Sequence, residues 1–185
     1  TPNEPLFTTE GLSRLRALRD DLQALEAVGS TNSILNVPLL HSPDLTLDTV
    51  DSEIKTLDEH DVAPATGRQA LLDNPMYPNL LISEDGKTTA IQVNLPTPGR
   101  YFDLLNQRNE LREKVNRGEA SEAERTQLEQ TSDEFIRYTE QLGEERDATI
   151  NQVRAILEQY RDHASIHLGG VPMIVADMIR FIESD

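Results

Sequence analysis

The stretch from Asn79 to Leu95 limits the folds open to this chain, because its hydrophobic period is that of a β-hairpin. Asp85 and Gly86 form a dipeptide favoured in tight hairpin turns. After the turn, every second residue belongs to one set of β-forming or apolar side chains: Thr89, Ile91, Val93 and Leu95. The residues between them are small or polar, so the strand has one apolar face. The sequence therefore predicts a hairpin that is covered on one side only.

Helical periodicity surrounds this hairpin. Leucines recur at spacings of three and four from Leu12 to Leu25, with Thr8 or Thr9 as the N-cap and Gly29 as the stop. A second helix is predicted from Tyr101 to Val115, ending at Gly118. The predicted fold class is therefore α+β, with helices packed on a small sheet.

A third helix is predicted to return along the second one. Ser121 and Glu124 form a capping box at its start. Three apolar residues then follow at seven-residue spacing, the pattern of an antiparallel helical hairpin: Leu128, Phe135 and Leu142. We expect Gly143 to interrupt this helix, and the broader apolar stripe from Ile150 to Tyr160 to lie on the sheet.

Weaker patterns complete the order of elements. Ile34, Leu35 and Val37 indicate a short strand that ends at Pro38. Weak helices are expected near residues 50–57 and 68–72, and a last strand at residues 165–168. Helix, strand, hairpin, helix and strand in this order give a ferredoxin-like split βαβ pattern that lacks its opening strand and carries an inserted helical hairpin.

The charge balance excludes some partners. The chain has 33 acidic and 17 basic residues, a formal net charge of −16. Nucleic-acid phosphates and anionic lipid surfaces need clustered Lys and Arg, so we expect no nucleic-acid partner. The absence of cysteine excludes disulfides but leaves the redox compartment open. The sequence shows neither a signal-peptide pattern at its start nor an apolar window of membrane-spanning length.

No arrangement of residues predicts catalysis. His163 and His167 stand four apart, but the predicted helix ends between them and no carboxylate or thiol completes a metal set. His41 and His60 lie in a polar stretch and are expected to be solvated. The acidic residues 51–61 lack the ligand spacing and glycine of a calcium loop. A P-loop, a dinucleotide fingerprint and a serine or cysteine nucleophile motif are all absent. We therefore expect no enzyme activity, no cofactor and no metal.

Two apolar features have more than one interpretation. Tyr101 and Phe102, beside Arg100, could stack on a ligand or could form the base of the helical arm. Residues 173–182 read MIVADMIRFI, in which eight of ten are apolar. Such a segment is either a core helix or the beginning of a helix that continues into a membrane.

The order of four segments resembles a known family. The segments are LFTTEGLSRLRALRDDLQAL, TNSILNVPLL, DNPMYPNLLISEDGKTTAIQVNL and IHLGGVPMIVADMIRFIESD. In this order they resemble the extracytoplasmic porter domains of the resistance-nodulation-division exporters, in the branch of the mycobacterial membrane-protein-large and hopanoid transporters.

The resemblance implies a domain plan. Residues 1–99 and 144–172 would form the porter body, residues 100–143 an inserted helical arm, and residues 173–185 the start of a helix leading into a membrane span. The matching structural positions are Asn36, Pro38, Asp85, Gly86, Gly169, Gly170 and Pro172, with the last three forming the return turn. The strand that family members carry before this domain is trimmed or absent.

The resemblance also implies a function. The chain would be the periplasmic side of a proton-driven inner-membrane exporter of hydrophobic or lipid-like substrates. Its partners would be the rest of the transporter chain and, through the arm, a second copy or an accessory protein. Two alternatives remain open: a free-standing helical interaction domain, and a small-molecule-binding domain with a pocket between sheet and helices.

Overall fold

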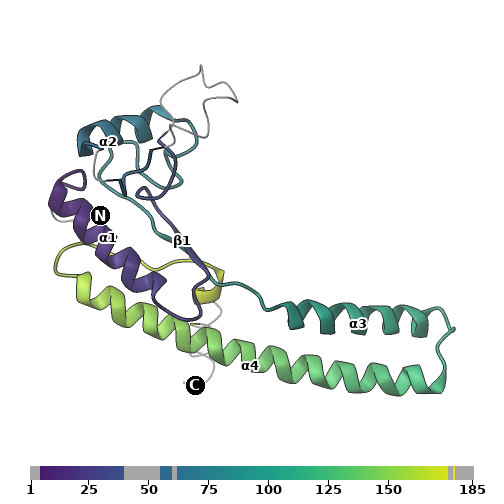
Figure 1. Cartoon of the computed structure of the whole chain (residues 1–185). Helices are drawn as coiled ribbons and strands as arrows, with labels where there is room; N and C mark the ends of the chain where they lie inside the picture. The colour runs from purple at the N-terminus through teal and green to yellow at the C-terminus, as the bar shows by residue number, and fades with distance from the viewer. Residues whose placement is uncertain (1–4, 40–54, 60–61, 175–176, 178–185) are drawn as a thin grey trace. The chain divides into compact units, whose positions relative to one another are not determined.

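The computed structural model describes all residues except 1–4, 40–54, 60–61, 175–176 and 178–185. The chain is mostly helical with a small antiparallel sheet, which confirms a mixed helix-and-strand fold. It divides into two compact units. The first comprises residues 1–95 and 152–169, and the second comprises residues 96–151 and 170–185. The longest helix contributes residues to both units (Figure 1).

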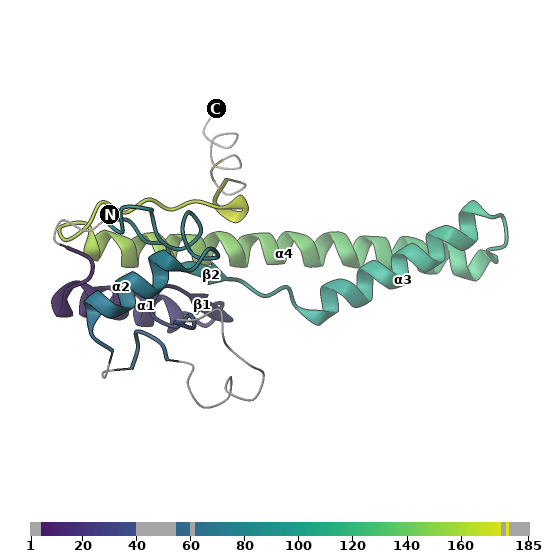
Figure 2. The same cartoon turned by 90° about the horizontal axis from the view of Figure 1, so that it is seen from above.

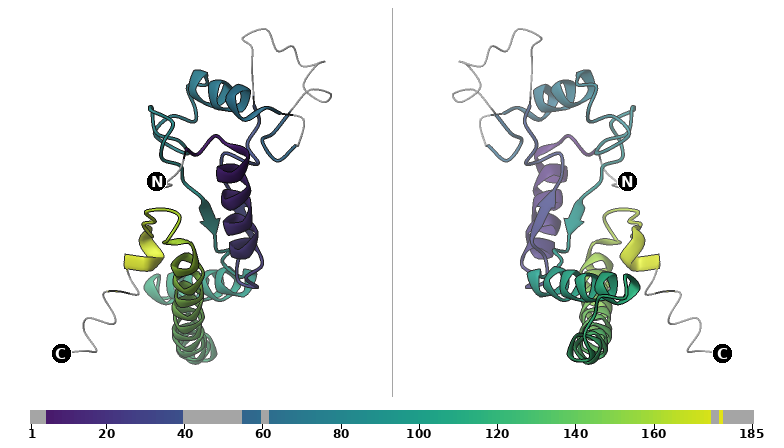
Figure 3. Two further views of the ribbon diagram at one scale, coloured as in Figure 1. Left: turned by 90° about the vertical axis from the view of Figure 1, so that its left-hand side faces the viewer. Right: turned by 90° about the vertical axis from the view of Figure 1, so that its right-hand side faces the viewer.

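Unit 1 begins with helix α1 (Thr9–Gln23), as the leucine spacing predicted. The hydroxyl of Thr8 accepts a hydrogen bond from the Gly11 N–H at 3.0 Å and so caps the helix. Strand β1 (Ser30–Asn32) lies beside α1 and pairs antiparallel with strand β2 (Gln92–Asn94) (Figure 3). The register places Thr31 opposite Val93.

The predicted strand at Ile34, Leu35 and Val37 is wrong, because the strand ends before these residues. The Asn36 side chain accepts from the Ser33 N–H and donates to the Thr31 carbonyl oxygen, both at 2.8 Å. These local bonds turn the chain and compete with a β-ladder. Ile34 and Leu35 are apolar because they are fully buried in the core.

The predicted turn at Asp85 and Gly86 is present, but β2 pairs with a different segment. Gly86 has φ +71°, and the Ser83 N–H donates to the Thr88 carbonyl at 2.9 Å. Beyond the turn, residues 92–94 leave the hairpin and pair with β1. The predicted alternation is confirmed, since Ile91 and Val93 are half-buried and Gln92 is exposed.

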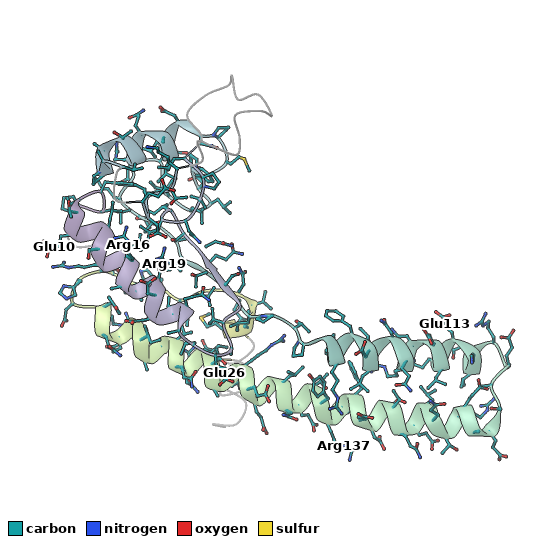
Figure 4. The ribbon with its side chains drawn as sticks, in the orientation of Figure 1. Glu10, Arg16, Arg19, Glu26, Glu113 and Arg137 are labelled. Atoms are coloured by element: carbon teal, nitrogen blue, oxygen red, sulfur yellow. The ribbon has the colours of Figure 1, made fainter. Side chains whose placement is uncertain are left out.

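In the main core of unit 1, helix α2 (Pro64–Asp73) packs against α1 and the connecting turns. Two arginines of α1 hold the turn at residues 57–58: Arg16 and Arg19 both pair with Asp58, and Arg16 also donates to the Leu57 carbonyl (Figure 4). The buried core residues are Leu6, Leu12, Leu15, Ile34, Leu35, Leu39, Leu57, Ala70, Leu71, Tyr77, Leu81 and Ile82.

The predicted helical hairpin lies within unit 2. Helix α3 (Gly99–Asn116) runs alongside and antiparallel to the first part of helix α4 (Glu122–Tyr160) (Figures 1 and 2). The capping box is formed, because the Ser121 N–H donates to Glu124 Oε2 at 2.8 Å and the Glu124 N–H donates to Ser121 Oγ. Gly118, at φ +73°, supports the turn between the helices.

Gly143 does not interrupt α4, so that prediction is wrong. A glycine inside a helix costs only about 1 kcal/mol relative to alanine. The neighbouring residues Leu142, Thr149 and Ile150 are buried, and their packing stabilises the continuous helix.

The two weak helices and the last strand that the sequence predicts have different outcomes in the structure. The weak helix at residues 68–72 is confirmed as part of α2. Of the weak helix at residues 50–57, residues 50–54 lie outside the described part of the chain, and Leu57 lies in a turn. Residues 165–168 are not a strand in the described structure. Residues 171–174 are helical with Val171 and Ile174 exposed, whereas most of residues 175–185 lie outside the described residues.

We expect Gly67→Ala and Gly143→Ala to shift stability in opposite directions. A Cβ on Gly67 would lie 2.2 Å from a methyl carbon of buried Leu57, so overpacking should lower the free energy of unfolding by about 1–3 kcal/mol. A Cβ on Gly143 meets nothing within 4 Å, so the same change should stabilise α4 by about 0.5–1 kcal/mol. Urea denaturation measures both. Equal effects of the two substitutions would contradict this packing.

We expect the Glu124 carboxyl to titrate far below the usual range of a glutamate side chain. Its hydrogen bond from Lys114, followed by those from the Ser121 N–H and hydroxyl, lowers its pKa to about 2. Because the folded pKa is depressed, this contribution to arm stability is present above pH 4.5 and is lost as the pH falls toward 2. Carbon NMR of the carboxyl measures the titration, Lys114→Met should raise the pKa, and Lys114→Arg is the matched control. An unchanged titration in Lys114→Met would contradict the assignment.

Candidate functional site

The described part of unit 1 contains an apolar groove of about 430 Å³. It is lined by α1, by the chain segment that leads into β2, by the end of α4, and by the segment that follows α4. All of its lining residues belong to unit 1. We call this feature the unit 1 groove.

The floor of the unit 1 groove is formed by leucine and valine side chains of two helices. Leu15, Leu18 and Leu22 lie on one face of α1 because they are three and four residues apart. Val153 and Leu157 are four residues apart and lie on the face of α4 that lines the groove. Leu22, Val153 and Leu157 are buried together, and Ile91, Val93, Ile166 and Leu168 pack against them. The two helices therefore cover the same face of the neighbouring extended segments.

The walls of the unit 1 groove are two runs of consecutive residues. One wall includes residues 88–91, and the other includes residues 163–169.

A tyrosine lies at the end of the groove formed by α4. The Tyr160 hydroxyl donates a hydrogen bond to Asp21 Oδ2 on α1. Burial, followed by this hydrogen bond and the negative charge of Asp21, raises the pKa of Tyr160 to about 12. The phenol is therefore neutral throughout the physiological pH range, and it joins the two floor helices rather than acting as a base.

The histidine pair that the sequence singles out also lies along the groove. His163 and His167 are both exposed and both line the wall that follows α4. Ser165 Oγ lies 3.3 Å from His167 Nε2. Among the described residues, no group of three or more His, Cys, Asp or Glu side chains is placed to hold a metal ion.

The structural positions that the family resemblance implies fall into two groups. One group lies outside the unit 1 groove, and the other forms the expected return turn. Pro38 accepts a hydrogen bond from the Tyr77 hydroxyl at 2.8 Å, and Asn36, Asp85 and Gly86 support turns outside the groove. Gly169 lines the groove and ends the last segment of unit 1.

The other two positions of the expected return turn follow directly. Gly170 has φ +121°, which favours glycine, and its carbonyl accepts from the Ile174 N–H at 3.2 Å. Pro172 therefore stands in the first turn of a helical stretch, where its missing N–H costs nothing.

Tyr101 and Phe102 belong to an aromatic cluster in unit 2. The Tyr101 ring lies 5.4 Å from the Phe135 ring, and the Arg108 guanidinium lies 4.2 Å from the Phe135 centroid. Phe102 keeps 50% of its surface exposed. Tyr101 therefore packs within the arm, in agreement with the second interpretation of this pair.

The sequence predicted a pocket between sheet and helices as one alternative, but it did not identify the residues of the unit 1 groove. The alternation of Thr89, Ile91 and Val93 showed which face is apolar, and Ile166 and Leu168 repeat it. No local pattern reports that these two segments line a common space.

Comparisons of the chain with family models, with curated proteins and with solved structures found no match in any of the three. None of the helices in the described residues is both long and apolar enough to span a membrane. The functional argument therefore depends on the geometry of the two units and on the sequence.

We expect the Tyr160 phenol to ionise near pH 12. Its folded pKa is raised, so its contribution to stability is present below pH 10 and is lost as the pH rises toward 12. Ultraviolet titration of tyrosinate should lose this late component in Tyr160→Phe. Asp21→Asn should move it only part of the way to the ordinary value, because burial remains. A late component that survives in Tyr160→Phe would contradict the assignment.

Proposed function

We propose that this chain is an extracytoplasmic porter domain of a resistance-nodulation-division exporter, in the branch that handles hydrophobic or lipid-like substrates. Unit 1 would be the porter body and unit 2 an inserted arm. The domain would contribute to the substrate pathway or its gate, on the periplasmic side of the inner membrane. Proton-driven energy conversion would take place in membrane helices outside residues 1–185.

The observation that carries the proposal is the order and layering of unit 1. The order α1, β1, β2 and the end of α4, with α2 inserted between the two strands, is the order that a split βαβ fold without its first strand would have up to its last strand. Both helices pack on one face of the extended segments. A ferredoxin-like fold has this two-layer arrangement, with helices on one side of an antiparallel sheet.

The arm supports the proposal as an insertion. Residues 100–143 lie between β2 and the part of α4 that belongs to unit 1, and they belong to the second compact unit together with residues 96–99, 144–151 and 170–185. An insertion at this position lengthens the second helix of the fold without altering the order of the other elements. Its exposed Phe102 and Ile136 are suited to contact with a partner subunit or accessory protein.

The return turn at Gly169 and Gly170 supports the proposal at the C-terminal end of unit 1. Gly169 and Gly170 separate unit 1 from the helical residues 171–174, whose Val171 and Ile174 are 72% and 51% exposed. Exposed apolar residues at the start of a helix fit a segment that continues into an apolar phase.

The exposed side chains of Phe102 and Ile136 also favour the alternative that the chain is a helical interaction domain. The unit 1 groove favours the alternative that the chain binds a small molecule. A groove of about 430 Å³ falls in the size range of ligand pockets, roughly 300–1,000 Å³. Saturable binding of a lipid or sterol to the isolated chain would favour the small-molecule alternative.

We expect the protein encoded by the complete gene to be an integral membrane protein. A run of about twenty apolar residues should begin within a few positions of Asp185, because that length crosses the hydrocarbon core. The full-length protein should remain in the membrane fraction after carbonate extraction, with unit 1 accessible to protease only from the periplasmic side. A full-length product found entirely in the aqueous fraction would refute the proposal.

Replacing residues 101–143 with a short Gly-Ser linker in the full-length protein should impair assembly or export. A matched control replaces only exposed Phe102 and Ile136 with serine, which keeps the arm folded and removes its apolar surface. Loss of export in both variants would locate the function of the arm in a contact. Unchanged export in both would show that the arm has no role in transport.

A further inference from the structure

We infer that one face of the helical arm is a docking surface for an amphipathic helix of another protein, whose apolar stripe is flanked by acidic side chains. The partner helix would lie along α3 and α4 and complete a three-helix bundle. This inference rests on the proposed function for the role of the arm as a contact surface, and it adds the chemical class of the partner.

Phe102 and Ile136 lie on the same side of the arm. The rings of Tyr101 and Phe135 meet between the two helices, with 5.4 Å between their centroids, and α3 and α4 run antiparallel (Figure 2). Each residue of an α-helix is turned by about 100° from the one before it. In two antiparallel helices, one step beyond a pair of facing residues therefore leads to the same side of the pair. Phe102 and Ile136 each follow one of the two rings, and they are 50% and 51% exposed.

A second stripe of α4 lies beside the stripe that packs on α3. Its positions recur at alternating spacings of four and three, the period of a coiled-coil seam, and most of them are exposed. The residues of this second stripe are Arg125, Glu129, Ser132, Ile136, Thr139, Gly143 and Arg146. Together with the residues of α3 on the same side, Phe102, Leu105, Asn109 and Arg112, they form what we call the open arm face.

The centre of the open arm face can be covered without leaving hydroxyl groups unpaired. The Ser132 hydroxyl donates to the Leu128 carbonyl at 2.6 Å, and the Thr139 hydroxyl donates to the Phe135 carbonyl at 3.0 Å. Because both hydroxyls already bond within α4, their burial carries little desolvation cost. A Cβ on Gly143 would meet nothing within 4 Å, so an incoming helix can approach the backbone closely at this position.

Arginines surround this apolar centre. The ion pair between Lys114 and Glu124, at 2.8 Å, places Arg112 and Arg125 at the same end of the arm, and Arg146 ends the stripe at the other. Neither Arg112 nor Arg125 forms an ion pair with any residue that the structure describes. The face is basic although the whole chain has a formal net charge of −16. Charge complementarity therefore favours a partner helix with Asp and Glu beside its apolar stripe.

The open arm face is unsuited to a second copy of this chain. A two-fold contact brings the same surface of both copies together. With antiparallel arms, Arg125 of one copy would meet Arg146 of the other, because Ile136 lies midway between them. With parallel arms, each arginine would meet its own equivalent. Both arrangements place like charges side by side, which opposes association.

The test uses two designed helical peptides of about twenty residues, which match the roughly 30 Å between Arg125 and Arg146. Both peptides carry leucine along one stripe. The flanking positions are glutamate in the first and lysine in the second. Fluorescence anisotropy measures their affinities for the whole chain of 185 residues. We expect the glutamate peptide to bind at least about tenfold more tightly, although the net charge of the chain by itself would favour the lysine peptide.

Charge reversal on the open arm face should reverse this preference. The variant with Arg112→Glu and Arg125→Glu should bind the lysine peptide more tightly than the glutamate peptide. The matched control carries Arg117→Glu and Arg137→Glu, two exposed arginines outside the open arm face, and should keep the original preference. Phe102→Ser with Ile136→Ser should abolish binding of both peptides. Circular dichroism verifies that each variant keeps its helical content.

Several outcomes would overturn the inference. Equal affinity for the two peptides, or a preference that Arg112→Glu and Arg125→Glu leave unchanged, would show that the face does not select an acidic helix. Binding of phosphatidylglycerol vesicles through these arginines, without a peptide preference, would make the face a lipid-binding surface. Self-association in sedimentation velocity that Phe102→Ser and Ile136→Ser abolish would make it an interface between copies of this chain.

The same measurements separate this inference from the proposed function. A preference for the glutamate peptide, together with a full-length product that is not membrane-bound, would refute the proposed function and leave this inference standing. A membrane-bound full-length product whose isolated chain shows no preference would overturn this inference alone.

Discussion

The structure of unit 1 depends on the packing of two leucine-rich helical faces against one face of an extended segment. Leu22 of α1 and Val153 and Leu157 of α4 are separated by more than a hundred residues in sequence, yet they are buried together. Ile91 and Val93 contribute the matching face. Because a strand alternates with period two, this contact also determines which side chains of residues 88–94 face the two helices.

The helices could be predicted from the sequence because their signals are local. Leucine spacing and the Thr8 cap define α1, and Ser121 with Glu124 defines the start of α4. The failures are non-local or involve small energies. Gly143 predicts a helix stop, but a glycine inside a helix costs only about 1 kcal/mol and the buried neighbours outweigh this cost. Ile34 and Leu35 predict a strand wrongly, because an apolar run does not distinguish a strand from a buried turn.

The candidate site was harder to predict than the fold. The return turn at Gly169 and Gly170 could be recognised from residue type, because a φ of +121° at Gly170 is accessible mainly to glycine. The groove could not, since it exists only when residues 88–93 and 163–169 lie across a common space. The pair Tyr160 and Asp21 gave no sequence signal for the same reason: the two residues are far apart in the chain and meet only after α1 and α4 pack.

The floor of the unit 1 groove would contribute most to the affinity for an apolar occupant. Its apolar side chains supply free energy in proportion to the area that they bury, about 25 cal/mol per Å². Leu15, Leu18 and Leu22 of α1 and Val153 and Leu157 of α4 all line this floor. The floor therefore favours an occupant with a continuous apolar surface.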